Sequence, residues 1–147
     1  MIEMISTKGR YALRVMIDIA TYSDGQYITL KEISSRQDIS VKYLELIIAL
    51  LNHAGLLQSL RGTGGGYRLA KPASEYTAGE ILRAAEGTLA PIACLQSEPN
   101  TCERADRCTT FPFWREFYRV INEYTESVTL QKLVDDSKAM AGYDFSI

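Results

Sequence analysis

The chain has 147 residues, 46% of them hydrophobic and 23% charged, which fits one globular domain and excludes a multidomain assembly. Since it lacks the roughly 18 consecutive apolar residues of a membrane helix and an N-terminal secretion signal, we expect a soluble, cytoplasmic protein with no membrane partner. The net charge of −2 is the sum of a basic and an acidic half. Residues 1–72 contain nine Lys and Arg against six Asp and Glu, and residues 73–147 contain seven Lys and Arg against twelve Asp and Glu. We therefore expect the two halves to have different roles.

Three helices are predicted in the first third of the chain. Residues 8–22 place apolar side chains at helical spacing, and a capping box begins a short second helix over residues 30–36. Ser40 caps a third helix, whose inward face is an apolar stripe that ends before Gly55. Because the second and third helices are joined by the short turn 37–40, they predict a helix-turn-helix. The apolar stripes comprise Ala12, Val15, Met16 and Ile19, and Leu44, Ile47, Ile48 and Leu51, and the capping box pairs Thr29 with Glu32.

A two-stranded hairpin is predicted after the third helix. Residues 56–60 and 67–69 are short apolar stretches that flank the glycine-rich segment 61–66. Glycine carries no side chain, so this segment could approach another surface closely. A phosphate loop for nucleotides is the competing interpretation, but its Gly-Lys-Ser/Thr ending is missing, and the dinucleotide spacing would require glycine at Tyr67. We therefore expect a β wing over residues 56–70.

The second half of the chain is predicted to be helical on both sides of a loop. Thr77, in a second capping box with Glu80, begins a short helix. Pro112 suits the first turn of a longer helix of about 16 residues. A last short helix is expected over residues 129–136, and residues 87–110 show no periodicity.

The order of three helices and a hairpin predicts a winged helix-turn-helix in a mainly α fold. In that arrangement the third helix enters the major groove of DNA, while the wing tip reaches the flanking backbone or the minor groove. Leu46 lies on the same outward face and could offer apolar contact alone, for example to a thymine methyl group. A solvated helix face is the alternative, and the glycines beside Arg61 argue against it. The side chains expected to face DNA are Ser40, Lys42, Tyr43 and Glu45.

Three cysteines lie within a window of fifteen residues, and an odd number cannot pair completely inside the chain. They are separated by seven and by five residues, so the close pair typical of structural zinc sites is missing, and the single histidine, His53, lies on the third helix. Widely spaced thiolates suit an iron–sulfur cluster. Plain thiols, or thiols that bind a metal adventitiously, are an equally open alternative on spacing alone. The cysteines are Cys94, Cys102 and Cys108.

Four motifs of the chain are shared with a known family. They are Thr7-Lys8-Gly9-Arg10-Tyr11-Ala12, Ser40-Val41-Lys42-Tyr43-Leu44-Glu45, Leu60-Arg61-Gly62-Thr63-Gly64-Gly65-Gly66-Tyr67, and the three cysteines followed by Trp114-Arg115. Together they resemble the Rrf2 family of bacterial winged-helix repressors, and in particular its cluster-sensing IscR-like, NsrR-like and RirA-like members. The resemblance runs from Thr7 to Val134, which is nearly the whole chain.

The resemblance implies partners and a cofactor. The long helix that begins near Pro112 would hold a homodimer, and this dimer would bind a two-fold-symmetric operator in double-stranded DNA. The cysteines would bind a two-iron or four-iron cluster, which aerobic preparation can remove. The implied residues are Cys94, Cys102 and Cys108 at the cluster, Lys42, Tyr43, Glu45, Arg61, Gly62, Thr63 and Gly64 at the DNA, and Trp114, Phe117, Tyr118 and Ile121 in the aromatic stripe of the dimerisation helix.

Two departures from the family pattern leave the fourth ligand of such a cluster unknown. Phe111 stands where IscR-like members supply a histidine, and Arg10 stands where NsrR-like members supply an aspartate. A water molecule, a small thiol or a carboxylate would then complete the fourth iron site. Leu46 replaces an IscR-like glutamine, so the operator sequence of those relatives does not transfer. The candidate carboxylates are Glu98, Glu103 and Asp106.

We therefore expect a DNA-binding transcriptional repressor whose operator affinity is controlled by a cluster that responds to iron, redox state or nitric oxide. The alternative is a metal-free member of the family, regulated by thiol oxidation or by a partner metabolic enzyme. A small redox enzyme is disfavoured, because the chain lacks a Cys-x-x-Cys pair and a histidine near the cysteines. The expected organisation is a single compact domain in which residues 1–86 bind DNA, residues 87–110 form a sensor loop, and residues 111–147 form the dimerisation helix and C-terminal segment.

Overall fold

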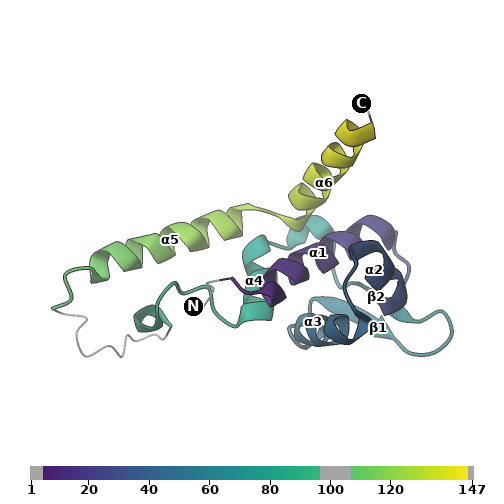
Figure 1. Ribbon diagram of the computed structural model, residues 1–147, viewed down its shortest axis with the longest axis horizontal. Helices are drawn as coiled ribbons and strands as arrows, with labels where there is room; N and C mark the ends of the chain where they lie inside the picture. The colour runs from purple at the N-terminus through teal and green to yellow at the C-terminus, as the bar shows by residue number, and fades with distance from the viewer. Residues whose placement is uncertain (1–4, 97–106, 146–147) are drawn as a thin grey trace.

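The computed structural model of the chain describes residues 5–96 and 107–145 (Figure 1). Within these ranges the chain is mainly α-helical with a two-stranded antiparallel sheet, as the sequence predicts, and none of the helices there is long and apolar enough to cross a membrane. The helices are α1 (Thr7–Tyr22), α2 (Leu30–Gln37), α3 (Val41–His53), α4 (Ala78–Glu86), α5 (Phe111–Ser127) and α6 (Leu130–Phe145), the strands are β1 (Leu57–Leu60) and β2 (Gly66–Leu69), and the short 3-10 turns are η1 (Ala73–Glu75) and η2 (Ala93–Leu95).

Side-chain caps begin α2 and α3 and shape the helix-turn-helix. The predicted capping box is present: the Thr29 hydroxyl accepts from the Glu32 N–H at 3.2 Å, and the Glu32 carboxylate accepts from the Thr29 N–H at 2.7 Å. The Ser40 hydroxyl caps α3 by accepting from the Tyr43 N–H at 3.2 Å. Between the two helices, Asp38 adopts a left-handed backbone conformation with φ of +54°, which turns the chain sharply. The helix-turn-helix prediction is confirmed.

The hydrophobic core of the body, residues 7–86, is built around α1. This helix contacts α2, α3, α4 and β2, and the start of α6 joins the same core (Figure 1). Every side chain of the two predicted apolar stripes is at most 2% exposed. Since burying an aliphatic side chain of this size is worth about 1.5–3 kcal/mol, these stripes hold α3 firmly against α1.

The wing is joined to the body along one strand. β1 and β2 pair in the antiparallel register that sets Leu60 opposite Gly66. The Tyr67 N–H donates to the Ile28 carbonyl at 2.8 Å, and the Ile28 N–H donates back to the Tyr67 carbonyl at 2.9 Å. A Cβ atom at residue 66 would lie 2.2 Å from the Ile28 carbonyl oxygen, so this close approach requires glycine. The predicted hairpin is confirmed.

Tyr76 fastens the base of the wing. Its side chain is fully buried, and its hydroxyl donates to the Leu56 carbonyl at 2.6 Å while accepting from the N–H groups of Ala70 at 2.9 Å and Lys71 at 3.2 Å. Burial raises the pKa of the Tyr76 phenol, so the hydroxyl keeps its proton and remains a donor. The Tyr76 carbonyl also accepts from the Leu130 N–H at 3.0 Å. One residue therefore links both sides of the wing base to the start of α6.

α5 and α6 extend away from the body in different directions (Figure 1). The C-terminal end of α5 is anchored on α4, because the Glu126 carboxylate accepts from the Thr77 hydroxyl at 3.1 Å and pairs with Arg83 at 2.5 Å. Hydrogen bonding to Arg83 lowers the pKa of the Glu126 carboxyl. At the joint between the two helices, the Ala78 N–H donates to the Val128 carbonyl at 2.8 Å. The rest of α5 leans outward from this attachment.

Two predictions in the second half of the chain are corrected. The capping box at α4 is half formed: the Glu80 N–H donates to the Thr77 hydroxyl at 3.0 Å, but the Glu80 carboxylate pairs with Lys71 at 3.0 Å. The sequence predicts the last helix over residues 129–136, and α6 in fact continues to Phe145. Its apolar stripe ends at Val134, so periodicity gives no signal for the rest of the helix.

Candidate nucleic-acid interface

The outward face of α3 exposes the side chains predicted to face DNA. Lys42 and Glu45 are exposed and Tyr43 is half-buried, whereas the apolar stripe of the same helix lies in the core. Ser40 is also exposed, and its hydroxyl, which accepts a hydrogen bond as the helix cap, can still donate its proton to a phosphate oxygen. The structure therefore brings these four residues together on one accessible surface.

Tyr43 is held against the first helix. Its ring meets the ring of Tyr11 edge to face, with 5.6 Å between the centroids, and the Arg14 guanidinium lies 5.0 Å from the Tyr11 centroid. Arg14 also donates to the Gln37 carbonyl in the turn before α3. These contacts fix the N-terminal end of α3 relative to α1, and in helix-turn-helix proteins that end contacts the bases.

A buried carboxylate holds α2 against α1. The Asp18 side chain is 0% exposed and accepts two hydrogen bonds from Arg36, at 2.8 and 2.9 Å, and one from the Gln37 amide at 2.9 Å. The Arg36 guanidinium also lies 4.2 Å from the centroid of the Tyr22 ring. Bidentate pairing compensates for taking the carboxylate out of water. Sequence reasoning missed this pair, although a charged residue inside the apolar stripe of α1 is a signal for one.

The tip of the wing is accessible to another molecule. Arg61, Gly62, Thr63 and Gly64 are all exposed. Gly62 and Gly64 have φ of +92° and +76°, and no described atom lies within 4 Å of a Cβ atom built at either position. The turn is closed by the Gly65 N–H, which donates to the Gly62 carbonyl at 3.0 Å. A DNA backbone could therefore approach this loop without meeting other parts of the described chain.

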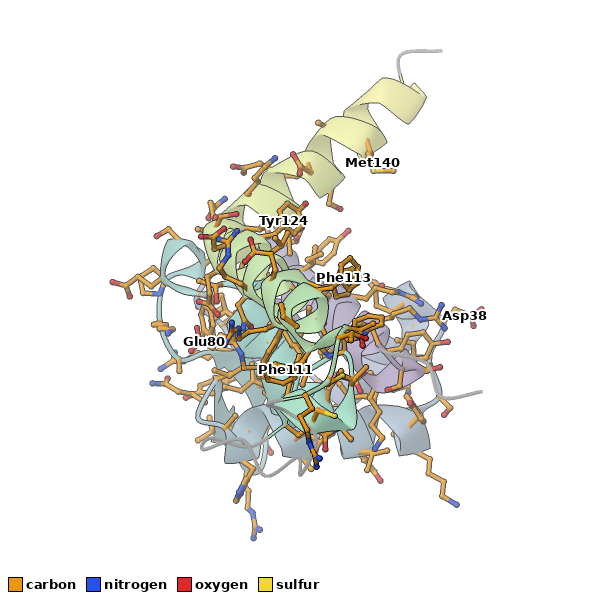
Figure 2. The ribbon with its side chains drawn as sticks, turned by 90° about the vertical axis from the view of Figure 1, so that its left-hand side faces the viewer. Asp38, Glu80, Phe111, Phe113, Tyr124 and Met140 are labelled. Carbon is orange, nitrogen blue, oxygen red and sulfur yellow. The ribbon has the colours of Figure 1, made fainter. Side chains whose placement is uncertain are left out.

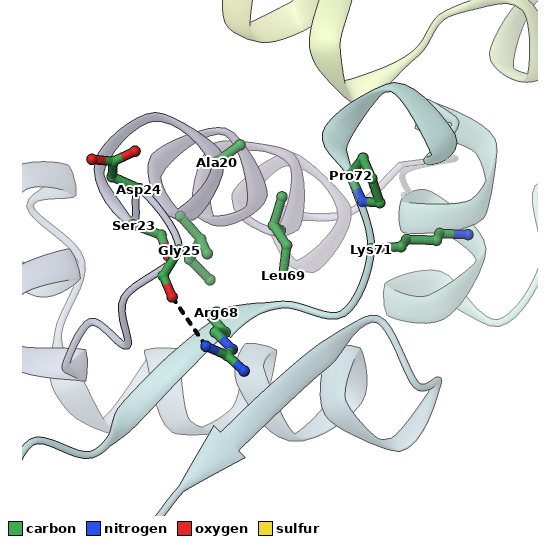
Figure 3. Close-up of a pocket in the computed structure, with 9 residues that line it drawn as sticks. Ala20, Ser23, Asp24, Gly25, Arg68, Leu69, Lys71 and Pro72 are labelled. Atoms are coloured by element: carbon green, nitrogen blue, oxygen red, sulfur yellow. Dashed lines mark hydrogen bonds between the residues drawn. The ribbon is translucent and has the colours of Figure 1, made fainter.

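Arg68 attaches the root of the wing to the turn after α1 (Figure 3). Its guanidinium donates to the Gly25 carbonyl at 3.0 Å and to the Gln58 side chain at 2.9 Å. A half-open hollow of about 270 Å³ lies beside it, with Arg68 and Lys71 in its lining. Both positive charges are engaged within the protein, since Lys71 pairs with Glu80. These two basic residues orient the wing, in contrast to Arg61 at its tip.

Two of the three cysteines are described, and both lie within the predicted sensor loop, residues 87–110. Cys94 in η2 and Cys108 before α5 are half-buried, and the Cys108 sulfur lies 3.4 Å from the Thr110 hydroxyl oxygen. Cys102 lies outside the described residues. Across the described ranges, no three His, Cys, Asp or Glu side chains gather where they could hold a metal ion. Thiolate sulfur is the donor that iron–sulfur clusters use, so the two described cysteines fit that group by their chemistry. The carboxylates considered as a fourth ligand, Glu98, Glu103 and Asp106, also lie outside the described residues.

The positions at which relatives of the resembled family supply a fourth ligand hold side chains without ligand chemistry. The Phe111 ring lies 5.6 Å from the Arg115 guanidinium. Arg10 is exposed and donates to the Thr7 hydroxyl at 3.5 Å. His53 is exposed in the last turn of α3, on the helix predicted to enter the major groove.

Glu86, the last residue of α4, caps the first helix from a distance in sequence. One of its carboxylate oxygens accepts from the Ser6 N–H at 2.8 Å, the Ser6 hydroxyl at 2.7 Å and the Gly9 N–H at 2.9 Å. A Cβ atom at Gly9 would lie 2.6 Å from the same oxygen, so a larger residue there would displace the Glu86 carboxylate from its capping position. Because Gly87 follows directly, the beginning of the cysteine-containing segment is tied to the N-terminus of α1.

α5 carries an apolar stripe that points away from the body. None of its residues is buried, and four large side chains spaced three or four residues apart are 39–68% exposed. Figure 2 shows Phe113 and Tyr124 projecting from the upper side of this helix and Phe111 from its lower side. The exposed side chains are Phe113, Phe117, Val120 and Tyr124.

The residues predicted for the dimer interface divide between two neighbouring stripes of α5. Phe117 belongs to the exposed stripe, whereas Trp114, Tyr118 and Ile121 are half-buried. The other three members of the exposed stripe are not among the predicted residues. Their spacing is the available signal, since apolar residues at i, i+4, i+7 and i+11 share one face of a helix.

The chain matches a family profile and known regulators over most of its length. The profile of Rrf2, described as an iron-dependent transcriptional regulator, matches residues 5–136. A helix-turn-helix-type transcriptional regulator of Neisseria meningitidis serogroup A is 41% identical over 131 residues, which cover 89% of this chain and 87% of the relative. The regulator IscR of Serratia proteamaculans is 36% identical over 140 residues, which cover 95% of this chain and 84% of the relative.

Solved structures of similar proteins have the same fold. CymR, the global cysteine regulator of B. subtilis, superposes with a TM-score of 0.72 at 36% identity, covering 92% of this chain and 98% of that one. The IscR of T. potens superposes with a TM-score of 0.73 at 34% identity, and the match covers 90% of this chain and 87% of that one. An oxidized form of Staphylococcus aureus CymR superposes with a TM-score of 0.69 at 33% identity, and the match covers 88% of this chain and 94% of that one. The relatives are transcriptional regulators rather than enzymes, which agrees with the sequence prediction.

Proposed function

The chain belongs to the Rrf2 family of transcriptional regulators, and from this premise we propose that it is a cytoplasmic repressor that binds a two-fold-symmetric operator as a homodimer. We propose further that an iron–sulfur cluster controls its affinity for the operator. The observation that carries the DNA-binding part is the division of α3 into a buried apolar face and an exposed polar face, beside an exposed wing tip.

In the proposed complex, residues 1–86 form the DNA-binding part and α3 lies in the major groove. Lys42 neutralises a phosphate, and Glu45 accepts a hydrogen bond from the amino group of a cytosine. Arg61 at the wing tip reaches the flanking backbone or the minor groove. The other proposed contacts are made by Ser40 and Tyr43 on α3 and by Gly62, Thr63 and Gly64 on the wing.

We propose that residues 111–147 form the dimerisation part and that a second copy of the chain packs against α5. The exposed stripe of four large apolar side chains supports this, because water-exposed apolar patches mark interaction sites. Phe117 lies within that stripe, and Trp114, Tyr118 and Ile121 border it on the side nearer the body. A dimer with two-fold symmetry would present two copies of α3 to two half-sites.

We propose that Cys94, Cys102 and Cys108 hold the cluster. The description of the family as iron-dependent regulators, the IscR relatives and the partial burial of the two described thiols support this assignment. When bound, the cluster would supply iron–thiolate bonds that respond to iron supply, oxidants or nitric oxide. Since Phe111 and Arg10 cannot ligate iron, the fourth ligand would be water, a small thiol or a nearby carboxylate.

The sensor segment, residues 87–110, is proposed to act on DNA through α1. Glu86, which directly precedes this segment, caps α1, and Tyr11 of α1 packs against Tyr43 of α3. A displacement of the segment would therefore act through a short series of contacts on the DNA-facing end of α3. Coupling of this kind is typically worth about 1–3 kcal/mol.

A second candidate function is regulation without a cluster. The similar structures include the cysteine regulator CymR and an oxidized form of it, which supports this candidate. In this alternative the cysteines would respond to thiol oxidation, or a metabolic enzyme would dock on the acidic half of the chain. Both versions keep the DNA-binding surface unchanged.

Anaerobic purification distinguishes the two candidates. Protein with a cluster should be coloured and contain iron and acid-labile sulfide, and Cys94→Ala, Cys102→Ala and Cys108→Ala should each remove the colour and change operator affinity. His53→Ala is the matched control, because it removes a metal-binding side chain outside the segment and should leave iron content unchanged. Iron-free protein whose DNA affinity responds to peroxide or to a co-purifying enzyme would favour the second candidate. Iron-free protein that is indifferent to cysteine substitution would contradict control by thiols altogether.

DNA binding is tested by removing the charge at the wing tip. Arg61→Ala should weaken operator binding by about 1–3 kcal/mol in a fluorescence-anisotropy titration, and the logarithm of affinity should fall steeply with the logarithm of salt concentration. Lys132→Ala on α6, whose partner is Asp136, is the control and should leave binding unchanged. A flat salt response would contradict the proposed interface.

A further inference from the structure

Two apolar side chains stand among the polar ones on the outward face of α3. Leu46 is 46% exposed and Val41 is 41% exposed, whereas Leu44 and Ile47, the inward neighbours of Leu46, are 0% exposed. Among the described residues, Leu46 is not one of those that pack against the hydrophobic core. Its side chain therefore contributes little to the stability of the fold, and its surface is available for contact with another molecule.

The position of Leu46 in α3 places it in the proposed DNA surface. It lies one helical turn after Lys42 and next to Glu45, so the three side chains share the outward face. The opening turns of a recognition helix are those nearest to the base edges. Because Tyr43 is held by Tyr11, this part of α3 has a fixed orientation relative to the body.

The chemistry of leucine restricts what it can recognise in the major groove. An aliphatic side chain neither donates nor accepts hydrogen bonds, so it cannot read the polar edges by which guanine, adenine and cytosine differ. The 5-methyl group of thymine is the apolar feature of that groove. A polar base edge covered by leucine would lose hydrogen bonds to water without replacement, which disfavours the other bases.

We propose that Leu46 is a specificity-determining residue that contacts a thymine methyl group, so that each half-site of the operator carries a thymine at the position facing it. This inference rests on the proposed DNA-binding function and deepens it by naming a base that α3 selects. It is independent of the cluster and of the physiological signal, because it uses the described residues of α3 alone.

In vitro selection from a random-sequence duplex library tests the inference, because selection itself identifies the operator motif. The wild-type chain should enrich a two-fold-symmetric motif with an invariant thymine in each half-site. Leu46→Ala should still enrich the motif but lose the preference at that one position. Leu46→Met is the matched control, because it keeps an apolar side chain of similar size and should keep the preference. Alanine and methionine are both good helix formers, so α3 should persist in both variants.

Replacing the selected thymine by deoxyuridine measures the methyl contact directly, since the two bases pair identically and differ by that methyl group. The wild-type chain should bind about fourfold more weakly for one replaced half-site and about 15-fold more weakly for both, the effect of leaving one or two methyl-sized groups uncovered. Leu46→Ala should respond by less than about twofold. An equal response of the two proteins, or unchanged binding of the wild type, would overturn the inference. Failure of the wild type to enrich any motif would instead overturn the proposed function, and the inference with it.

Discussion

The body and the projecting helices α5 and α6 use similar residues in opposite ways. In the body, the apolar stripes of α1 and α3 are at most 2% exposed, whereas the exposed stripe of α5 leaves 39–68% of each side chain accessible. The buried charge of Asp18 is paired with Arg36 on another helix, whereas Arg119 of α5 pairs with Glu116 and Glu123 along the same helix surface. The body thus completes its own core, whereas α5 leaves its apolar stripe exposed in the single chain.

This contrast shows that amphipathic spacing does not by itself identify the partner of a helix. α1 and α5 both carry clear apolar stripes, and the stripe of α1 packs within the chain while the stripe of α5 does not. The anchoring of α5 at its C-terminal end, through Glu126 and the joint at Val128, holds the helix outward and leaves its stripe accessible. Four substitutions test the contrast, in order of decreasing expected effect.

Phe117→Glu places a charge in the exposed stripe and should have the largest effect. Phe117 is 39% exposed in the single chain, and the substitution would place a charge at two symmetry-related positions of the interface. Burying an unpaired carboxylate costs about 3 kcal/mol or more, so the dimer dissociation constant should rise by at least about 100-fold. Sedimentation equilibrium measures this. Glu123→Gln, on the same helix and well exposed, should leave the dimer unchanged. A Phe117→Glu protein that remains a dimer would show that α5 is not the interface.

Asp18→Asn breaks the buried pair that holds α2 against α1. Removing one partner of a buried pair costs about 3–5 kcal/mol, and because Arg36 is 29% exposed and can rehydrate, we expect a loss of about 2–3 kcal/mol in the free energy of unfolding. Urea denaturation measures the change. Lys132→Ala removes the exposed pair with Asp136 on α6 and should cost less than about 0.5 kcal/mol. Similar losses in both variants would erase the difference between the two regions.

Tyr76→Phe keeps the buried ring and removes the hydroxyl at the base of the wing. Three backbone groups would lose their partner, so the free energy of unfolding should fall by about 1–3 kcal/mol. The same change at Tyr124, which is 68% exposed on α5, should alter monomer stability by less than about 0.5 kcal/mol. Thermal unfolding of both variants measures the two losses. If Tyr76→Phe is as stable as the wild type, a water molecule must replace the hydrogen bonds of the hydroxyl.

Glu86→Gln should have the smallest effect. The amide oxygen can still accept the bonds from Ser6 and Gly9, but the negative charge at the N-terminus of α1 is lost, which costs about 0.3–1 kcal/mol. The free energy of unfolding should fall by that amount, while Glu75→Gln in η1, exposed on the surface, should leave it unchanged. If residues 87–110 act on DNA binding through α1, Glu86→Gln should also reduce the difference in operator affinity between untreated protein and protein that has lost its cluster or has oxidised cysteines.

Most of the body could be predicted from the sequence because its signals are local. The Thr29–Glu32 capping box, the Ser40 cap and the apolar stripes of α1 and α3 each act within a few residues, and each is present in the structure. The glycines of the wing likewise indicate a hairpin. Because the apolar stripe predicts which face of α3 is buried, it also predicts that the opposite face is exposed. The candidate DNA surface could therefore be predicted together with the fold.

The features that escaped prediction depend on residues distant in the sequence. Asp18 meets Arg36 and Glu86 meets Gly9 through packing of separate helices, and no short-range pattern specifies which partner each finds. The exposed stripe of α5 includes Phe113, which the prediction does not name, and leaves out Trp114, which is half-buried and packs edge to face on Phe113 and Phe117. The prediction for α6 is too short, since its apolar stripe ends before the helix does.

Caps, periodicity and glycine placement act over a few residues, so the elements of the body and the mainly α class could be predicted without the structure. The tertiary structure decided which apolar faces are satisfied within the chain. It buries the stripes of α1 and α3 together and leaves that of α5 exposed, because α5 is attached to the body at its C-terminal end and projects from there. The apolar stripe of α3 already predicts that Leu46 faces outward beside Lys42 and Glu45, and the packing of separate elements against the opposite face decides how much of Leu46 stays accessible, 46% of its surface.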